Sequence, residues 1–174
     1  MKYAVLDSHL GSVVLFARDT HLCRLDMYPP DSDDVHRLIA MEFPEATESP
    51  GRFRHAGELL RRYFDGEEVL LDIPIDLSGL RDFTKRVLEE TRKIPYGKIA
   101  SYGMIAGRLG YPNAARAVGQ ALKRNPIPVV IPCHRIVRGD GSLGGFDMGL
   151  DTKVRLLSIE GLHVRELQKS MLLS

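Results

Sequence analysis

Ile131-Pro132-Cys133-His134-Arg135 is the stretch that decides how the second half of the chain folds. Its proline and two earlier ones, Pro126 and Pro128, cannot lie within a helix, so a helix is expected to end before them, near Arg124. An extended strand is then expected to lead to Cys133, which lies where regular structure ends and beside a potential base. This position indicates a nucleophile rather than a core residue.

The region around this cysteine is strongly basic. From Thr91 to Gly139 there is no Asp or Glu, and nine Lys and Arg residues give a local charge of +9. Because the whole chain carries +1, the remaining residues carry −8. A cationic block around a nucleophile indicates a polyanionic substrate, with nucleic acid the leading choice, and positive surroundings are expected to favour the thiolate of Cys133.

The composition is that of an ordinary globular protein. With 174 residues, 44% of them hydrophobic, the chain can form one substantial core, or a small domain tethered to a larger one. No apolar signal-peptide region opens the sequence, and no run approaches the roughly 20 residues that span a bilayer. We therefore expect an intracellular protein without membrane attachment, in which Cys23 and Cys133 stay reduced.

The first half of the chain is predicted to be a small α/β domain. Short β-rich runs at 3–6, 12–16 and 22–27 predict an antiparallel meander. Apolar residues then recur at helical spacing within 35–43 and 59–64, and 69–75 alternates like one more strand. A domain boundary is expected where Ser78-Gly79 separates the acidic half from the basic half.

The second half is predicted to be mainly helical. An apolar stripe over 80–91 predicts one helix, and a last helix is expected over 150–160, stopped by Gly161. Between them Ser101 is expected to cap a short helix to Leu109, and Asn113 a second helix to Arg124, which together make a helix-turn-helix. The predicted fold class is α+β, with an N-terminal α/β domain at 1–78 and a helical domain at 79–174.

Metal chemistry is not expected at this cysteine. Zinc needs three or four protein ligands, and no second Cys/His pair lies near Cys133 in the sequence. His134 cannot easily present its ring to the side chain of its immediate neighbour, so a bridging water is the expected proton route.

The second half closely resembles the O6-alkylguanine-DNA alkyltransferases, strongly over about residues 80–162 and only weakly before. The matching segments are Ile94-Pro95-Tyr96-Gly97, Ser101-Tyr102, Ala114-Ala115-Arg116-Ala117-Val118-Gly119, Asn125-Pro126-Ile127-Pro128, Ile131-Pro132-Cys133-His134-Arg135-Ile136-Val137 and Gly141-Ser142-Leu143-Gly144-Gly145. The resemblance implies a helical DNA-binding domain, and irreversible, single-turnover transfer of an alkyl group from guanine O6 in duplex DNA to the cysteine, without a cofactor.

The resemblance also implies catalytic roles. Cys133 is the alkyl acceptor, His134 takes its proton through water, Glu160 orients the imidazole, and Asn125 braces the active-site turn. On the residues alone, Glu160 is a solvated helix-end residue and Asn125 merely ends a helix before Pro126. A carboxylate in the last turn opposes the helix dipole at a small cost, which favours the orienting role.

The target base lies inside a duplex and must be extruded. The resemblance implies that Arg116 fills the vacated place in the stack and that Tyr102 crowds the phosphate and promotes rotation of the base. On the residues alone, Arg116 is a simple phosphate contact. Small residues in the second helix favour close approach to the minor groove. The predicted DNA-contacting residues are Tyr102, Ala115, Arg116, Ala117, Gly119, Lys123 and Arg124.

The base pocket is predicted to include Tyr102, Ile136, Phe146, Asp147 and Met148. Phe146 stands where many members carry tyrosine, and Met148 where several carry glycine, so the pocket width is expected to differ. The N-terminal zinc ligands of some members are not matched here, and no metal is expected. The expected partner is double-stranded DNA containing O6-alkylguanine, bound by a monomer in the cytoplasm, or in the nucleus of a eukaryote.

Two other functions are consistent with parts of this pattern. Relatives that lack the cysteine recognise alkylguanine without removing it, but Cys133 is present here. A cysteine hydrolase using Cys133, His134 and Glu160 has no need of the basic block. The number of turnovers separates the three: one for the transferase, zero for the binding module and many for the hydrolase.

Overall fold

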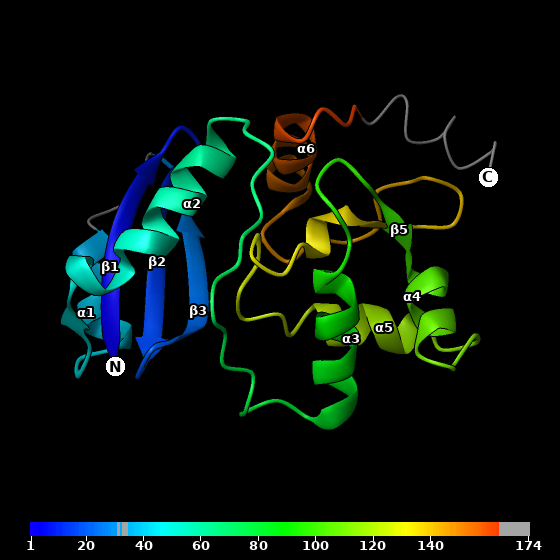
Figure 1. Ribbon diagram of the computed structural model, residues 1–174, viewed down its shortest axis with the longest axis horizontal. Coiled ribbons are helices and arrows are strands. Elements are labelled where there is room, and N and C mark those ends of the chain that lie inside the picture. The colour runs from blue at the N-terminus through cyan, green and yellow to red at the C-terminus, as the bar shows by residue number, and fades with distance from the viewer. Residues whose placement is uncertain (31, 33–34, 164–174) are drawn as a thin grey trace. The chain divides into compact units, whose positions relative to one another are not determined.

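The computed structural model describes residues 1–30, 32 and 35–163 of the chain (Figure 1). The chain divides into two compact units, Met1–Ser78 and Gly79–Ser174. Helices and strands are mixed, with an antiparallel sheet in the first unit and mainly helices in the second, which confirms the α+β class. The last part of the predicted second domain, 164–174, lies outside the described residues.

The sheet of the first unit is the predicted meander. Strands β1 (Lys2–Ser8), β2 (Gly11–Arg18) and β3 (His21–Tyr28) pair antiparallel in sequence order, and the short β4 (Thr47–Glu48) adds parallel to β1. The tight connection of β1 to β2 requires glycine, because Gly11 has a φ of +115° and an added Cβ would lie 2.0 Å from the carbonyl oxygen of Tyr28.

Two helices cover opposite faces of this sheet. Helix α1 (Val35–Glu42) packs Ile39 against Val14 and Phe16, whose side chains share one face. Helix α2 (Arg54–Phe64), preceded by a 3-10 turn at Pro50–Phe53, crosses the other face (Figure 1). Gly57 of this helix lies against Leu6 of β1. Residues of β2 from Val13 to Ala17 are buried for this reason, since both faces are covered.

The strand predicted at 69–75 does not form. Burial does alternate there, with Leu71 and Ile73 buried and Leu70 exposed, but Ile75 alone makes a bridge, to Leu22. The N–H groups of Asp72 and Ile73 donate to carbonyls two residues earlier, which curls the segment away from a ladder. The alternation of apolar residues thus correctly predicts which side chains are buried, but it does not predict whether the backbone pairs with a neighbouring strand.

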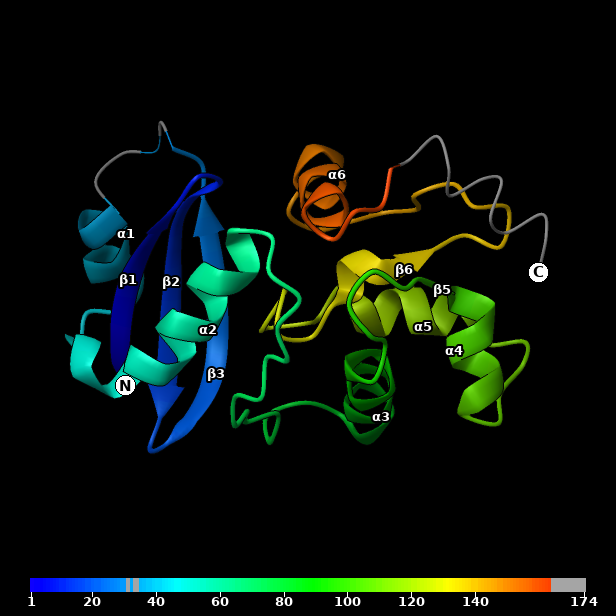
Figure 2. The ribbon, with the colours of Figure 1, turned by 45° about the horizontal axis from the view of Figure 1, so that its top comes forward.

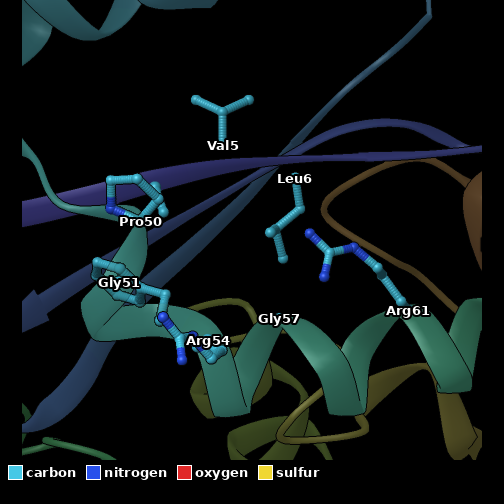
Figure 3. Close-up of a pocket in the computed structure, with 9 residues that line it drawn as sticks. Val5, Leu6, Pro50, Gly51, Arg54, Gly57 and Arg61 are labelled. Atoms are coloured by element: carbon cyan, nitrogen blue, oxygen red, sulfur yellow. The ribbon is translucent and has the colours of Figure 1, made fainter.

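A pocket of about 270 Å³ lies within the first unit, between β1 and the start of α2 (Figure 3). Its lining residues are Ala4, Val5, Leu6, Pro50, Gly51, Phe53, Arg54, Gly57 and Arg61. The set includes two guanidinium groups but no nucleophile, base or acid. The pocket therefore has no residues for the chemistry that the sequence predicts, and those residues lie in the second unit.

The second unit contains the predicted helix-turn-helix. The helices of this unit are α3 (Asp82–Arg92), α4 (Tyr102–Arg108), α5 (Ala115–Leu122) and α6 (Leu150–Ile159). The helix-turn-helix is formed by α4 and α5, and α3, α4 and α5 pack on one another. A short parallel pair, β5 (Ala100–Ser101) with β6 (Ile136–Val137), was not predicted and lies beside α4 and α5 in Figure 2. This pair joins the chain before the helix-turn-helix to the chain after Cys133.

One of the two predicted helix caps is correct. The side chain of Ser101 accepts a hydrogen bond from the Met104 N–H at 3.1 Å and caps α4 as expected. Asn113 does not cap α5: it lies in a turn closed by the bond from Ala114 N–H to Tyr111 C=O, and α5 begins at Ala115. The helix therefore starts later than the sequence predicts.

Candidate functional site

The segment that leads to Cys133 is a compact turn, and the predicted extended strand is wrong. The side chain of Asn125 bonds to three groups of this turn: its Oδ1 accepts from Ile127 N–H at 3.0 Å, and its Nδ2 donates to Ile131 C=O at 2.9 Å and to Cys133 Sγ at 3.1 Å. The amide thus satisfies backbone groups that a strand would have paired with a neighbour. The sulfur is held at the end of this turn, in a 3-10 helix at Cys133–Arg135.

The turn stores backbone strain. Val129 is fully buried and has a φ of +72°, in the left-handed region that is rare for a β-branched residue. Such a conformation costs roughly 1–2 kcal/mol. It persists because the bonds of Asn125 on either side hold the chain, and strain of this kind is concentrated at functional sites.

The thiol of Cys133 is buried, with 9% of the residue exposed. Burial raises its pKa to about 11, against the hydrogen bond from Asn125 and the charge of Lys153, which both lower the pKa. The expectation that positive surroundings favour the thiolate is therefore wrong for the resting site. The cation that acts on the sulfur, Lys153, lies outside the basic block, and desolvation outweighs it.

His134, Arg135 and Glu160 form a buried cluster next to this thiol. His134 is fully buried, and its Nε2 lies 2.7 Å from Glu160 Oε1. Arg135 donates from Nε to Glu160 Oε2 at 2.9 Å and from Nη2 to Oε1 at 3.0 Å, and the Gly97 N–H donates to Oε2 at 3.1 Å. The structure thus brings His134 and Glu160 together, as the sequence predicts.

Electrostatics fix the charge states within this cluster. Burial would raise the pKa of Glu160, but the hydrogen bonds and charges of His134 and Arg135 lower this pKa to about 2. Burial lowers the pKa of His134, although Glu160 acts to raise it. An ionised carboxylate accepts from Nε2, so the proton of a neutral imidazole sits on Nε2 and Nδ1 is the basic nitrogen.

Arg135 is a residue whose role the sequence does not reveal. It counts there as one of nine cations of the basic block, but in the structure it is 7% exposed and ion-paired with Glu160. Its Nη1 also donates to Ile94 C=O at 2.5 Å. Arg135 is therefore part of the internal support of the site, and it does not belong to the surface that meets a polyanion.

Lys153 is the second residue that the sequence analysis missed. It is fully buried, its Nζ donates to Ile136 C=O at 2.5 Å and to Leu143 C=O, and burial lowers its pKa to about 8. A signal was present, because Lys153, Leu156 and Glu160 recur at the spacing of one helix face. Two charged residues on the buried, otherwise apolar face of a helix indicate internal partners.

Tyr102 lies between α5 and the loop after Leu143. Its ring is 3.6 Å from where a Cβ of Gly119 would lie, and its hydroxyl donates to Gly145 C=O at 3.5 Å. Gly144 has a φ of +68°, and a Cβ there would lie 2.7 Å from the Tyr102 hydroxyl oxygen. Tyr102 therefore connects a predicted DNA-contacting helix with the predicted base pocket.

Gly144→Ala is expected to destabilise the second unit by about 1–3 kcal/mol, because the new methyl group overlaps the Tyr102 hydroxyl and the backbone is left-handed. Urea unfolding measures the change. Gly145→Ala is the matched control, since nothing lies within 4 Å of a Cβ added there. Equal losses in the two variants would contradict the close contact of Gly144 with Tyr102.

Helix α5 exposes the residues predicted to contact DNA. Arg116 and Ala117 are exposed, Ala115 and Gly119 are partly buried, and Lys123 and Arg124 are exposed just after the helix ends. The opposite face holds the helix in place through the buried residues Val118, Ala121 and Leu122. Small and basic side chains thus share the exposed face, which suits close approach to a phosphate backbone.

The predicted pocket residues differ in exposure. Ile136 is fully buried in β6, where it pairs with Ala100 of β5. Phe146 and Met148 are partly buried, and Asp147 is exposed. The last three lie in one loop, between β6 and α6.

Cys23 and Cys133 are both free thiols, and the Cys23 thiol donates to Phe16 C=O at 3.4 Å within the first unit. Within 1–30, 32 and 35–163, no three His, Cys, Asp or Glu residues are grouped as a metal site requires. No helix in the same part of the chain is long and apolar enough to cross a membrane.

The second unit combines a thiol held by an asparagine, a buried histidine–carboxylate pair and a helix-turn-helix with a basic exposed face. These features together indicate a DNA-binding domain that carries a reactive cysteine. Comparison with known proteins agrees. Residues 1–77 match the 6-O-methylguanine DNA methyltransferase, ribonuclease-like domain, and residues 82–162 match the 6-O-methylguanine DNA methyltransferase, DNA binding domain. The chain belongs to the 6-O-methylguanine DNA methyltransferase family.

Individual relatives are similar over nearly the whole chain. The methylated-DNA–protein-cysteine methyltransferase of Mycolicibacterium paratuberculosis is 41% identical over 163 residues, which cover 94% of each protein. That of Methanosarcina acetivorans is 36% identical over 92% of this chain and 99% of its own. The crystal structure of Mycobacterium tuberculosis OGT in complex with DNA superposes with a TM-score of 0.80 at 35% identity, over 96% of this chain and 99% of that chain.

Proposed function

We propose that this protein repairs DNA by transferring an alkyl group, typically methyl, from guanine O6 in duplex DNA to Cys133, once per molecule. The observation that carries the proposal is the hydrogen bond from Asn125 to the buried Sγ, beside the His134–Glu160 pair. Family membership and the DNA complex of the similar mycobacterial protein support the substrate class.

The transfer step balances without a cofactor. Sγ forms a bond to the alkyl carbon as the bond from that carbon to O6 breaks, and the electron pair stays on the guanine, which takes up a proton from water at N1 and becomes the ordinary base. The carbon is neither oxidised nor reduced, because the oxygen substituent is replaced by sulfur. The resulting thioether has no low-energy route back to a thiol, so each molecule reacts once.

Proton removal is the task of His134 in this proposal. With a pKa of about 11, Cys133 is protonated in the resting site and must lose its proton as it attacks. A water carries that proton to His134 Nδ1, and ionised Glu160 stabilises the imidazolium that forms. Asn125 and Lys153 act in the same direction, since each favours the thiolate.

DNA recognition in this proposal rests on α5. Arg116 and Ala117 are exposed on the helix, and Lys123 and Arg124 follow it, so the helix can lie in the minor groove with cations near both backbones. Arg116 fills the place of the extruded guanine, and Tyr102 crowds its phosphate. The base then enters the pocket formed with Ile136, Phe146, Asp147 and Met148.

The two units have separate tasks in this account. We assign 79–174 to a DNA-binding and transfer domain, because Cys133 and all of its partners lie there, and 1–78 to a separate α/β domain. A substrate in chromosomal DNA places the protein inside the cell, in the cytoplasm of a prokaryote or the nucleus of a eukaryote, and we propose that it acts as a monomer.

Counting turnovers tests this function against its two rivals. Duplex DNA with labelled O6-methylguanine is incubated in excess with protein of known active concentration. We expect one label per protein molecule, transferred to protein. No transfer despite binding would support the recognition module, and release of many labels per molecule would support a hydrolase.

Arg116→Ala is expected to slow repair of duplex DNA at least about tenfold. Without the arginine side chain nothing fills the vacated place in the stack, so the cost of unstacking, a few kcal/mol, is no longer offset. Reaction with free O6-benzylguanine needs no extrusion and should change little. Both rates are measured by single-turnover kinetics, with Arg155→Ala, an exposed arginine of α6, as a control of equal charge. Equal slowing of both substrates by Arg116→Ala would refute the intercalating role.

A further inference from the structure

A cluster of two aromatic rings and a guanidinium lies at the turn between α4 and α5, outside the residues assigned to the site. Tyr111 of this turn is 46% exposed, and its ring meets the ring of Phe83 of α3 edge-on, with centroids 6.0 Å apart. The guanidinium of Arg86, about one turn further along α3, lies over the same tyrosine ring, 5.6 Å from its centroid. The cluster therefore joins α3 to the turn of the helix-turn-helix.

Three contacts fix the direction of the Arg86 side chain. Besides the ring contact, its Nη1 donates to the Tyr111 hydroxyl at 3.4 Å and its Nη2 donates to Leu109 C=O at 3.2 Å. A guanidinium has five N–H donors, so these two bonds leave donors for another acceptor. Arg86 is also exposed, so a long cationic side chain is held in one place on the surface of the protein.

The cluster lies at the start of α5. The turn that contains Tyr111 is closed by the bond from Ala114 N–H to Tyr111 C=O at 2.9 Å, and α5 begins at the next residue, Ala115. A helix of this length spans about 12 Å, and Lys123 and Arg124 follow its other end. Arg86 therefore lies at one end of the proposed DNA-binding helix, and the other two cations lie at the opposite end.

The chain itself supplies no cation for phosphate at the N-terminal end of α5. Residues 109–115 contain neither lysine nor arginine, and Arg116 is assigned to the base stack in the proposed function. A helix that lies in the minor groove has a phosphate backbone on each side of it, because the groove is only about 6 Å wide. Arg86 brings a cation to this end from α3.

The charge of Arg86 is not neutralised by a carboxylate. In the part of the chain that the structure describes, it forms no ion pair with Asp82 or Glu90, the acids one turn away on α3. Glu90 is paired instead with Lys93 and Arg108. An exposed guanidinium that is held in position without a carboxylate partner is suited to bind a phosphate oxygen.

We propose that Arg86, held on the ring of Tyr111, contacts a backbone phosphate of the DNA at the N-terminal end of α5. This inference rests on the proposed function and adds to it a positioning residue from α3. A phosphate contact carries no sequence information, but it fixes the orientation of the protein on the duplex. Arg86 takes no part in the transfer step.

The test is the salt dependence of affinity for one duplex, from about 50 to about 200 mM salt. Each phosphate contact contributes about 0.9 to the slope of log affinity against log salt. We expect Arg86→Ala to reduce the slope by this amount, so that over this range its affinity falls about threefold less than that of the native protein. Arg86→Lys keeps the charge and should keep the slope. Arg155→Ala removes an exposed arginine of α6 and should also keep the slope.

The role of Tyr111 is tested through its ring. Tyr111→Phe keeps the ring under the guanidinium and should bind DNA almost as the native protein does. Tyr111→Ala releases Arg86 and should weaken binding several-fold. In an Arg86→Ala background Tyr111→Ala should have little further effect, because the side chain that the ring positions is absent. An equally large loss from Tyr111→Ala in both backgrounds would show that Tyr111 does not act through Arg86.

Two results would overturn the phosphate contact. One is an equal slope in Arg86→Ala and the native protein, and the other is an equal reduction in Arg86→Lys and Arg86→Ala, which would assign the effect to the structure of the turn. Reaction with free O6-benzylguanine involves no phosphate and should be the same in Arg86→Ala and the native protein. Failure of the native protein to accept methyl from O6-methylguanine would instead refute the proposed function, so the two failures are distinguishable.

Discussion

Cys133→Ala is expected to abolish alkyl transfer while leaving affinity for duplex DNA largely intact. The proposed acceptor atom is lost, and no other thiol of the second unit can replace it, since the remaining cysteine, Cys23, lies in β3. Binding rests on the exposed cations at α5, which the substitution does not touch. Transfer of labelled methyl to protein and a binding titration against duplex DNA give the two readings.

The matched control for this variant is Cys23→Ala. It removes the other thiol, which is half-buried against the first-unit cluster of Val14, Phe16 and Ile39, and it should retain full transfer. Loss of transfer in Cys23→Ala together with retention in Cys133→Ala would show that Cys23, and not Cys133, is the acceptor.

Glu160→Ala is expected to lower the free energy of unfolding of the second unit by about 3–5 kcal/mol, because it leaves the buried guanidinium of Arg135 without its partner. His134 loses its hydrogen bond at the same time. For a protein of this size the melting temperature should fall by roughly 6–20 °C. Glu89→Ala removes an exposed carboxylate and should change stability by less than about 0.5 kcal/mol.

The same substitution should change how stability depends on pH. The pKa of Glu160 is about 2 in the folded protein against an ordinary value of 4.5, so its contribution is complete above about pH 5 and is lost as the pH falls towards 2. The lowered pKa of His134 acts with the same sign, since the unfolded state gains a proton first. Urea unfolding at pH 6 and pH 3 should therefore show a smaller acid loss for Glu160→Ala than for the native protein. An equal acid loss in both would contradict the ionised, buried state of Glu160.

Sequence patterns that depend on local rules were reliable in this chain. The meander of β1, β2 and β3 follows from alternation and turn residues, and the Ser101 cap follows from the hydrogen-bonding chemistry of a helix start. The position of Glu160 at the end of α6 follows from Gly161, which has a φ of +75°.

Features that depend on contacts distant in sequence were not predictable. The turn before Cys133 is set by the Asn125 side chain bonding six and eight residues ahead, which no propensity scale contains. The buried Arg135 is hydrogen-bonded to Glu160, 25 residues away, and the buried Lys153 is hydrogen-bonded to the carbonyl of Ile136, 17 residues away. The protonation of Cys133 depends on burial, so counting nearby charges in the sequence gave the wrong direction.

The most direct test of the account is to locate the transferred group after reaction. Native protein is mixed with a slight excess of duplex DNA carrying O6-methylguanine, digested, and analysed by mass spectrometry of the peptides containing Cys133 and Cys23. We expect one methyl group per protein, on Cys133 alone, with unmodified guanine restored in the DNA. Restored guanine without methyl on Cys133, or methyl released to solvent, would contradict transfer to this sulfur.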